Sequence, residues 1–163
     1  MEVNLFGAFL CTRAVLPGMF ERQQGCIINA ASGAGLAPIP NYSSYAVSKT
    51  ALIRFSESLA MEARDKGVQV FAVSPGMVRT AMTEYSAGEE GQRWLPWTKE
   101  LFEKDRFVPP EQAAELVLRL ASGKYGALNG LYLTIRDDLD KLLERIGDVR
   151  KRELYTLRLK VEE

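Results

Sequence analysis

A tyrosine and a lysine stand four residues apart at Tyr45 and Lys49. On an α-helix this spacing places both side chains on one face. A nearby ammonium favours the phenolate form of a tyrosine, and such a phenol can exchange a proton with an alcohol or a carbonyl. The pair alone is weak evidence, because tyrosine and lysine at this spacing are also ordinary on exposed helix surfaces. A rival phenol, Tyr42, lies seven residues before Lys49, and we interpret it as structural.

Ser32 strengthens the case for chemistry. It precedes Tyr45 by thirteen residues and directly follows a short apolar run at 26–31 that is typical of a buried strand. Ligands of α/β proteins bind at the carboxyl ends of the strands, where a hydroxyl can hydrogen-bond a substrate oxygen on which charge develops. The alternative is that Ser32 only helps to form the Gly- and Pro-rich loop at 32–41.

The elements that must position these residues follow from the hydrophobic pattern. Apolar runs bounded by turn residues predict strands, and apolar residues at helical spacing predict helices. Pro110 is expected at the first position of a helix, and Asp138 is expected to cap a later helix that Gly147 would end. The predicted strands cover 26–31, 68–73 and 131–135, and the predicted helices cover 3–20, 43–64, 110–120, 139–146 and a stretch from about 149.

Helices and strands alternate along the chain, which indicates an α/β fold with a parallel sheet covered on both faces. Three strands make only a partial doubly wound, Rossmann-like sheet, and no G-x-G-x-x-G turn occurs, so the first βαβαβ half is expected to be missing. We take residues 1–163 as the C-terminal portion of a single domain, with 135–163 as a helical extension. The helix at 3–20, apolar on most sides, is expected to be buried, and the connection at 87–107 is expected to hold one or two helical turns.

Composition excludes several classes of function. The 21 Lys and Arg balance the 21 Asp and Glu, so the chain has no general attraction to nucleic acid or to an anionic membrane. The lack of histidine excludes a Ser-His-Asp triad, and the spacing of the cysteines fits no zinc site, so no metal is expected. Cys11 and Cys26 are expected to be buried. The early apolar run at 5–11 is shorter than a membrane span and lacks a basic leader, which favours a cytoplasmic protein.

Three segments together resemble the short-chain dehydrogenase/reductase family. Residues 25–49, GCIINAASGAGLAPIPNYSSYAVSK, are similar to the family's strand, catalytic serine and Y-x-x-x-K signature in order and spacing. Residues 3–7, VNLFG, match its VN-x-x-G helix, and residues 74–80, SPGMVRT, match its P-G-x-V-x-T turn. The resemblance runs from residue 3 to about residue 135.

The resemblance implies a role for each matched residue. Tyr45 would be the catalytic acid/base, and Lys49 would hold the nicotinamide ribose and favour the Tyr45 phenolate. Ser32 would orient a substrate carbonyl, and Asn4 would anchor a water in a proton relay from Lys49. The implied reaction moves a hydride between NAD or NADP and a carbonyl/alcohol pair. The nicotinamide end of the cofactor would contact Pro75, Gly76, Val78 and Thr80.

The resemblance also implies partners. Family helices that correspond to 3–20 and 43–64 pair with their copies in another subunit, and 111–121 with 131–135 resemble a second interface, so a homodimer or homotetramer is expected. The family's T-G-x-x-x-G-x-G turn and N-A-G motif do not occur here. The pyrophosphate cradle and the residue that selects NAD or NADP would therefore lie outside this chain, and the chain is expected to be N-terminally truncated.

Two other functions stay open as alternatives. The chain could be a non-catalytic remnant or a subunit-assembly module that uses the family's surfaces only for pairing. A sugar epimerase of the extended relatives shares Y-x-x-x-K, but the short C-terminal part leaves little room for a sugar-binding domain. Within the connection at 87–107, Trp94, Leu95 and Trp97 either cover an apolar substrate or anchor the loop to the protein.

Overall fold

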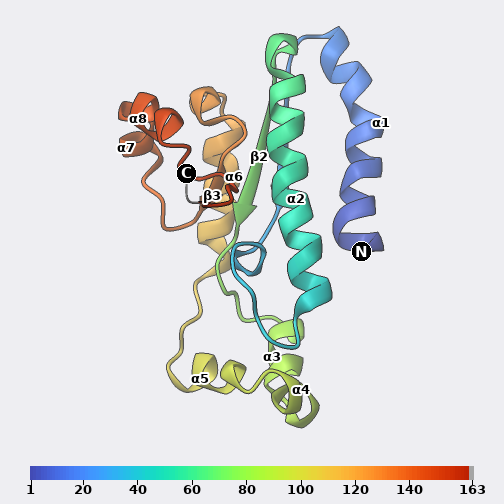
Figure 1. Cartoon of the computed structure of the whole chain (residues 1–163), viewed down its shortest axis with the longest axis vertical. Helices are drawn as coiled ribbons and strands as arrows, with labels where there is room; N and C mark the ends of the chain where they lie inside the picture. Colours follow the sequence, from blue (N-terminus) through green and yellow to red (C-terminus); the bar gives the residue numbers. More distant parts are fainter. Residues whose placement is uncertain (162–163) are drawn as a thin grey trace.

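A parallel sheet of three strands forms the centre of the computed structural model, which describes residues 1–161 (Figure 1). The strands β1 (Gly25–Ala30), β2 (Val68–Ser74) and β3 (Tyr132–Thr134) lie in the order β1-β2-β3. Gly25 is paired with Val68 at one end of the β1–β2 ladder, and Ala72 of β2 is paired with Tyr132. The prediction of a partial, Rossmann-like parallel sheet is confirmed.

Helices cover both faces of this sheet (Figure 1). One face carries α1 (Ala8–Glu21), which follows a π-helical turn at Glu2–Gly7, and α2 (Ser43–Glu62). The other face carries α6 (Pro110–Ala121), α7 (Leu139–Glu144) and α8 (Ile146–Lys151). Beyond the carboxyl end of β2 the chain forms a lobe of three short helices, α3 (Ala81–Ala87), α4 (Glu89–Trp94) and α5 (Trp97–Glu103). Short 3-10 turns occupy Gly33–Gly35, Arg64–Lys66 and Gly126–Leu128.

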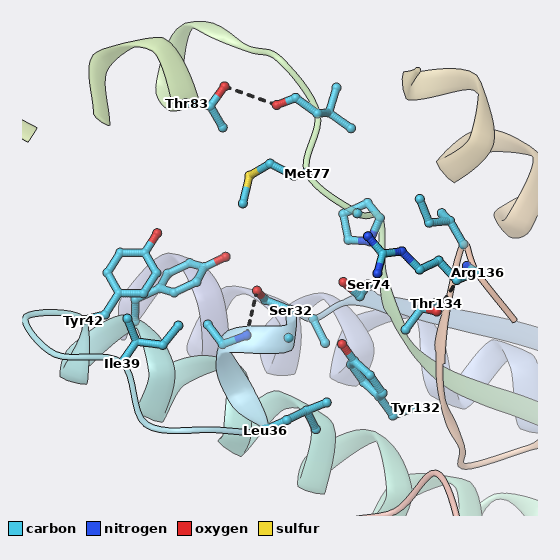
Figure 2. Close-up of a pocket in the computed structure, with 18 of the residues that line it drawn as sticks. Ser32, Leu36, Ile39, Tyr42, Ser74, Met77, Thr83, Tyr132, Thr134 and Arg136 are labelled. Atoms are coloured by element: carbon cyan, nitrogen blue, oxygen red, sulfur yellow. Dashed lines mark hydrogen bonds between the residues drawn. The ribbon is translucent and has the colours of Figure 1, made fainter. Parts of the chain in front are cut away.

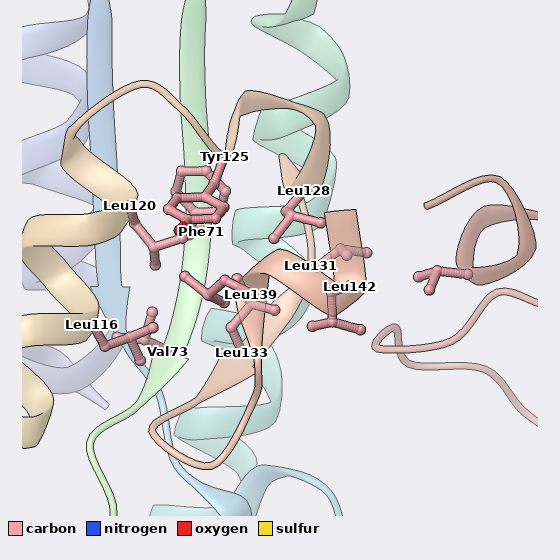
Figure 3. Packing of buried hydrophobic residues seen from close by; sticks show 11 residues of the cluster. Phe71, Val73, Leu116, Leu120, Tyr125, Leu128, Leu131, Leu133, Leu139 and Leu142 are labelled. Carbon is pink, nitrogen blue, oxygen red and sulfur yellow. The ribbon is translucent and has the colours of Figure 1, made fainter. Parts of the chain in front are cut away.

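The two faces of β2 fill two separate cores, because successive side chains of a strand point to opposite faces. Phe71 and Val73 belong to a cluster formed with α6, α7 and β3 (Figure 3). Val68 and Val70 belong to a cluster formed with β1 and α2. Fully buried Leu120, Leu128, Leu131, Leu133 and Leu139 make the first cluster the larger of the two. Because these side chains are buried, the strands are held in place and their carboxyl ends lie together at one edge of the sheet.

The predicted strands and the two long helices occur within a few residues of their expected bounds, but two expectations about helices were wrong. The connection at 87–107 holds α4 and α5 rather than one or two turns. Gly147 does not end a helix; it lies inside α8, and the break falls at Arg145, with φ −111° and ψ 22°. Leu142 before the break and Val149 after it are both buried in the same core. One continuous helix would not necessarily bring both side chains into that core. Asp138 caps α7 as predicted, accepting from the Lys141 amide at 3.2 Å.

The expectation that the first helix is buried was also wrong. Thr12 is the one buried residue of α1, while Val3 is 86% exposed and Phe6, Phe9, Leu10 and Val15 are exposed as well. Only one side of α1, through Leu16, Met19 and Phe20, packs on the core beneath it. The pattern showed that the helix is apolar, but not that this chain leaves most of its apolar surface uncovered.

The expected burial of Cys11 fails on the same helix. Cys11 is exposed rather than buried, whereas Cys26 on β1 is half-buried and its burial raises the pKa of its thiol. By length and composition the helical segment Glu2–Glu21 could cross a membrane, a test that buried helices of soluble proteins pass too. The contiguous run at 5–11 understated how apolar this segment is.

A helical extension was predicted at 135–163; within its described part, 135–161, the helices are α7 and α8. The tail that follows runs back over the sheet, where the Tyr132 amide donates to the Tyr155 carbonyl at 2.9 Å. Arg158 then pairs with the buried carboxylate of Glu57 on α2 at 2.8 Å. These contacts hold the tail on the body of the protein as far as Arg158, and residues 162–163 lie outside the described residues.

Candidate active site

A cleft of about 590 Å³ opens at the carboxyl ends of the three strands (Figure 2). The segments that follow β1 and β2 form two of its walls, and the end of β3 forms a third. Parallel strands bring their carboxyl ends to one edge of a sheet, which is where α/β proteins bind ligands. Of the residues singled out in the sequence, the cleft is lined by Ser32, Tyr45, Pro75, Gly76, Val78 and Thr80.

Ser32 is held by the turn that follows it. Its backbone is extended, and its hydroxyl accepts from the Ala34 amide at 3.2 Å, which caps the turn at Gly33–Gly35. A side chain on Gly35 would meet the backbone of Lys49 and Thr50 at 2.9 Å, so only glycine lets the turn lie directly on α2. The Thr50 hydroxyl donates to the Gly35 carbonyl at 2.9 Å. The loop and the helix thereby set Ser32 and Tyr45 in one cleft wall.

Tyr45 and Lys49 lie on the first turns of α2 as their spacing predicted. The Lys49 ammonium is 5.5 Å from the centre of the Tyr45 ring. It donates to the Ala30 carbonyl, at the end of β1, at 2.7 Å. Partial burial lowers the pKa of Lys49. The ammonium is therefore held between the strand end and the phenol, behind the cleft wall rather than in it.

Asn4 contacts the same helix from the N-terminal side. Its amide donates to the Ser48 hydroxyl at 3.2 Å, and that hydroxyl donates to the Tyr45 carbonyl at 2.7 Å. Ser48 is fully buried, so this chain of hydrogen bonds ties residues 2–7 to the turn of α2 that carries the Tyr–Lys pair. Asn4 does not line the cleft.

The turn at 74–80 forms the wall opposite Ser32. Gly76 has φ +77°, a left-handed conformation that favours glycine, and the Val108 amide donates to the Met77 carbonyl at 2.8 Å. Thr80 caps α3 by accepting from the Thr83 amide at 3.3 Å. The Arg79 guanidinium lies 5.3 Å and 5.0 Å from the ring centres of Phe102 and Phe107. These contacts fix the turn to the lobe of short helices.

Tyr42 lies closer to the site than its sequence position suggested. Its ring is 4.7 Å from that of Tyr45, it lines the cleft, and burial together with the neighbouring Tyr45 raises its pKa. Trp97 meets the other side of Tyr42 edge-on at 6.2 Å, and the Trp94 carbonyl accepts from Asn41 at 2.8 Å. Neither tryptophan lines the cleft. Of the two interpretations of these tryptophans, the structure favours anchoring of the loop.

Sequence reasoning missed the wall supplied by β3. Tyr132, Thr134 and Arg136 line the cleft (Figure 2). Tyr132 and Thr134 are alternate positions of β3, which share one face of the strand, and that alternation is the signal that could have found them. Arg136 lies in the turn after the strand, where alternation gives no signal. Burial raises the pKa of the Tyr132 phenol. Within residues 1–161 no group of three or more metal-ligating side chains comes together.

This arrangement suits proton transfer to a polarised oxygen. A hydroxyl and a phenol lie in one cleft wall, and an ammonium stands behind the phenol. Two hydrogen-bonding groups that converge on one oxygen can stabilise charge as it develops there.

Comparisons with known proteins agree with this geometry. The family model of short chain dehydrogenase matches residues 1–91. The chain is 35% identical over 122 residues to a 3-oxoacyl-(acyl-carrier-protein) reductase of Synechocystis sp., covering 75% of this chain and 47% of that protein. It is 34% identical over 137 residues to a protein of Xanthobacter autotrophicus named inactive 2-(S)-hydroxypropyl-CoM dehydrogenase 2, covering 83% and 60% respectively.

A solved structure shows the same likeness in three dimensions. The F189W variant of actinorhodin polyketide ketoreductase, determined with NADPH, superposes with a TM-score of 0.72 at 32% identity, over 80% of this chain and 54% of that one. The chain spans about half the length of the relatives it matches. On the family model and on these relatives, the chain belongs to the short-chain dehydrogenase family.

Proposed function

We propose that this chain carries the catalytic part of an oxidoreductase that uses NAD or NADP to interconvert a carbonyl and an alcohol. The observation that supports the proposal is the shared cleft: Ser32, Tyr45 and the turn at 74–80 face one space at the carboxyl edge of the sheet. Lys49 stands behind Tyr45, fixed by the Ala30 carbonyl.

The residues present fit the nicotinamide end of such a cofactor. Gly76 presents its backbone to the cleft without a side chain. A side chain at this position would come within 2.5 Å of Ile135. Lys49 retains donor capacity beyond its bond to Ala30, as binding of ribose hydroxyls requires. A glycine-rich pyrophosphate turn does not occur in the sequence, so the fit covers only this end of the cofactor. When bound, the cofactor supplies or accepts the hydride.

The side chains of this chain would handle the oxygen and its proton. Ser32 Oγ would donate a hydrogen bond to the substrate oxygen. In reduction the Tyr45 hydroxyl would give its proton to that oxygen as the carbonyl carbon gains hydride, and in oxidation it would take the proton back. The Lys49 ammonium would stabilise the phenolate that remains. Asn4 would act through Ser48, by holding the turn that carries Tyr45.

Nicotinamide absorbance on the complete protein tests this function. NADH or NADPH should be oxidised only when a ketone or aldehyde is present, and a panel of small ketones would reveal this. Lack of turnover with every carbonyl and alcohol, with both cofactors, would overturn the proposal.

The 163-residue chain by itself should bind NADH and NADPH more weakly than micromolar. The reason is that the pyrophosphate is normally held at the N-terminus of a helix behind a glycine-rich turn, and the sequence has no such turn. Isothermal titration measures the affinity directly. Micromolar binding by the isolated chain would show that the residues described here suffice for the cofactor.

We expect the complete protein to be a dimer or tetramer. Apolar side chains are exposed along α1 and, at Val47 and Met61, on α2, and exposed apolar area favours association. Light scattering should therefore give a mass at least twice that of one subunit. The same surface makes the isolated chain prone to association, and a monodisperse monomer that melts cooperatively would contradict the expectation.

A second function has one observation in its favour. The relative of Xanthobacter autotrophicus that is 34% identical is named as inactive. A chain that keeps the exposed α1 and α2 surface but does no chemistry would be an assembly module. Association without turnover, in the two measurements above, would favour this function over the first.

A further inference from the structure

Among the described residues that line the cleft, Arg136 is the only charged one. It follows β3, and in Figure 2 Ser32 lies between the Tyr42 ring and the Arg136 side chain. The rest of the lining is hydroxyl-bearing or apolar, with Leu36, Ile39, Met77, Met82 and Ile135 as its large aliphatic side chains. Arg136 is exposed, so water solvates its guanidinium while the cleft is open.

The acidic neighbours of Arg136 are engaged elsewhere. Asp137 accepts from the amide and the hydroxyl of Thr134, at 2.6 Å and 2.8 Å. Asp138 caps α7 and pairs with Lys141 at 3.1 Å. Within residues 1–161 the Arg136 guanidinium forms no ion pair. Its charge is therefore available to a molecule in the cleft.

The backbone also directs Arg136 toward the cleft. The Arg136 amide donates to the Thr134 hydroxyl at 3.2 Å, and that hydroxyl donates in turn to Asp137. This closed turn places Thr134 and Arg136 on the cleft side and keeps Asp137 on the other, against the second hollow near Tyr155. The orientation is thus built into the end of β3.

We infer that the substrate is a ketone, or the corresponding alcohol, that carries an oxyanion group, with its carbonyl at Ser32 and Tyr45 and its anion on Arg136. A guanidinium binds a carboxylate, phosphonate or sulfonate through two parallel hydrogen bonds. The aliphatic lining fits the short carbon chain between the two groups. This inference rests on the proposed function and adds the class of substrate to it.

The test compares matched acids and amides on the complete protein. The probes are 4-oxopentanoate, 5-oxohexanoate and 6-oxoheptanoate, each beside its neutral amide, with 4-oxopentylphosphonate as a second anion. The best acid should exceed its amide in kcat/KM by about tenfold to a hundredfold, the effect expected of hydrogen bonds to a charged group. A higher value for the phosphonate than for the acids would identify a phosphate-type anion rather than a carboxylate.

Arg136→Gln should remove this preference. It should lower kcat/KM for the acids by about tenfold to a hundredfold and leave kcat/KM for the amides within about twofold. Arg136→Lys keeps the charge but loses the paired donors of the guanidinium, so its kcat/KM for the acids should lie between those of the unmodified protein and Arg136→Gln. Arg145→Gln is the matched control, since Arg145 lies outside the cleft and pairs with Asp148 at 3.2 Å. Equal kcat/KM for acids and amides in the unmodified protein would overturn the inference, as would an equal loss on both in Arg136→Gln.

Binding measurements distinguish a failure of this inference from a failure of the proposed function. Isothermal titration of the same acids and amides needs no turnover. Acid binding that Arg136→Gln weakens, in a protein that reduces no ketone, would uphold the anion site and overturn the oxidoreductase. Reduction of ketones without any preference for acids would uphold the oxidoreductase and overturn the anion site, and the absence of both binding and turnover would overturn both.

Discussion

Replacing Tyr45 with phenylalanine should lower the rate of hydride transfer by about two to four orders of magnitude, the range that general acid–base groups contribute. The substitution removes only the hydroxyl that would move the proton. Lys49, 5.5 Å from the ring centre, and the Ser32 hydroxyl in the same cleft would stay in place. Nicotinamide absorbance on the complete protein gives the rate.

Stability should change little in this variant. The Tyr45 ring keeps its contact with Tyr42 at 4.7 Å, and within residues 1–161 the Tyr45 hydroxyl has no hydrogen-bond partner to lose. Melting temperature should therefore match that of the unmodified protein to within a few degrees, which separates loss of chemistry from loss of fold.

Tyr42→Phe is the sharpest comparison, because it removes the hydroxyl of the phenol whose ring packs against Tyr45. Tyr42 is seven residues from Lys49, and we expect this variant to keep far more activity than Tyr45→Phe. Near-normal turnover in Tyr45→Phe, or the larger loss in Tyr42→Phe, would show that Tyr45 is not the acid/base.

Local patterns were enough to predict the frame of the fold. β1 and β2 are runs of apolar residues bounded by Gly25, Gly67 and Pro75, and burial on both faces of the sheet leaves such runs little other choice. Gly67 takes φ +69°, and a side chain there would meet the Gln23 backbone at 2.1 Å. At this position the residue type follows directly from the space available.

The burial of α1 and the break between α7 and α8 depend on long-range packing, which local sequence patterns do not predict. An apolar helix is buried only where another surface covers it, and nothing in residues 8–21 specifies that surface. The break between α7 and α8 depends on a core that both Leu142 and Val149 enter, not on Gly147, around which there is open space. Patterns within one segment carry no record of such distant neighbours.

The candidate site also contains residues that the sequence could predict and residues that it could not. Ser32, Tyr45 and the turn at 74–80 could be found because their types and spacing are recorded in the sequence. Arg136 could not, because its direction depends on how Thr134 and Asp137 hydrogen-bond at the end of a three-residue strand. Tyr42 was set aside for its distance from Lys49 along the chain, although its ring lies against Tyr45.

Substituting alanine for Gly76 should both destabilise the protein and reduce its activity. Gly76 has φ +77°, and a Cβ there would lie 2.5 Å from Ile135 Cδ1 and 2.9 Å from Val108 Cγ2. The left-handed conformation costs about 1–2 kcal/mol for a residue with a side chain, and the overpacking adds about 1–3 kcal/mol. Denaturant unfolding should show a total loss of about 2–5 kcal/mol.

Gly123→Ala isolates the conformational part of this cost. Gly123 has φ +82°, close to the value at Gly76, but a Cβ there would meet nothing within 4 Å. This variant should lose only about 1–2 kcal/mol and should keep its activity, because Gly123 does not line the cleft. The difference between the two variants then measures how tightly Gly76 is enclosed.

The steric conflict at Gly76 also predicts where activity is lost. Relief of the overlap requires Ile135 or the turn at 74–80 to move, and both line the cleft. Val108, the other neighbour, is tied to the same turn through its bond to the Met77 carbonyl at 2.8 Å, so it has little room to yield alone. We therefore expect Gly76→Ala to lose at least tenfold in kcat/KM at temperatures where it remains folded, since an ångström of misplacement can cost about a hundredfold. Equal stability and activity in the two alanine variants would mean that the turn at 74–80 does not have the enclosed form described here.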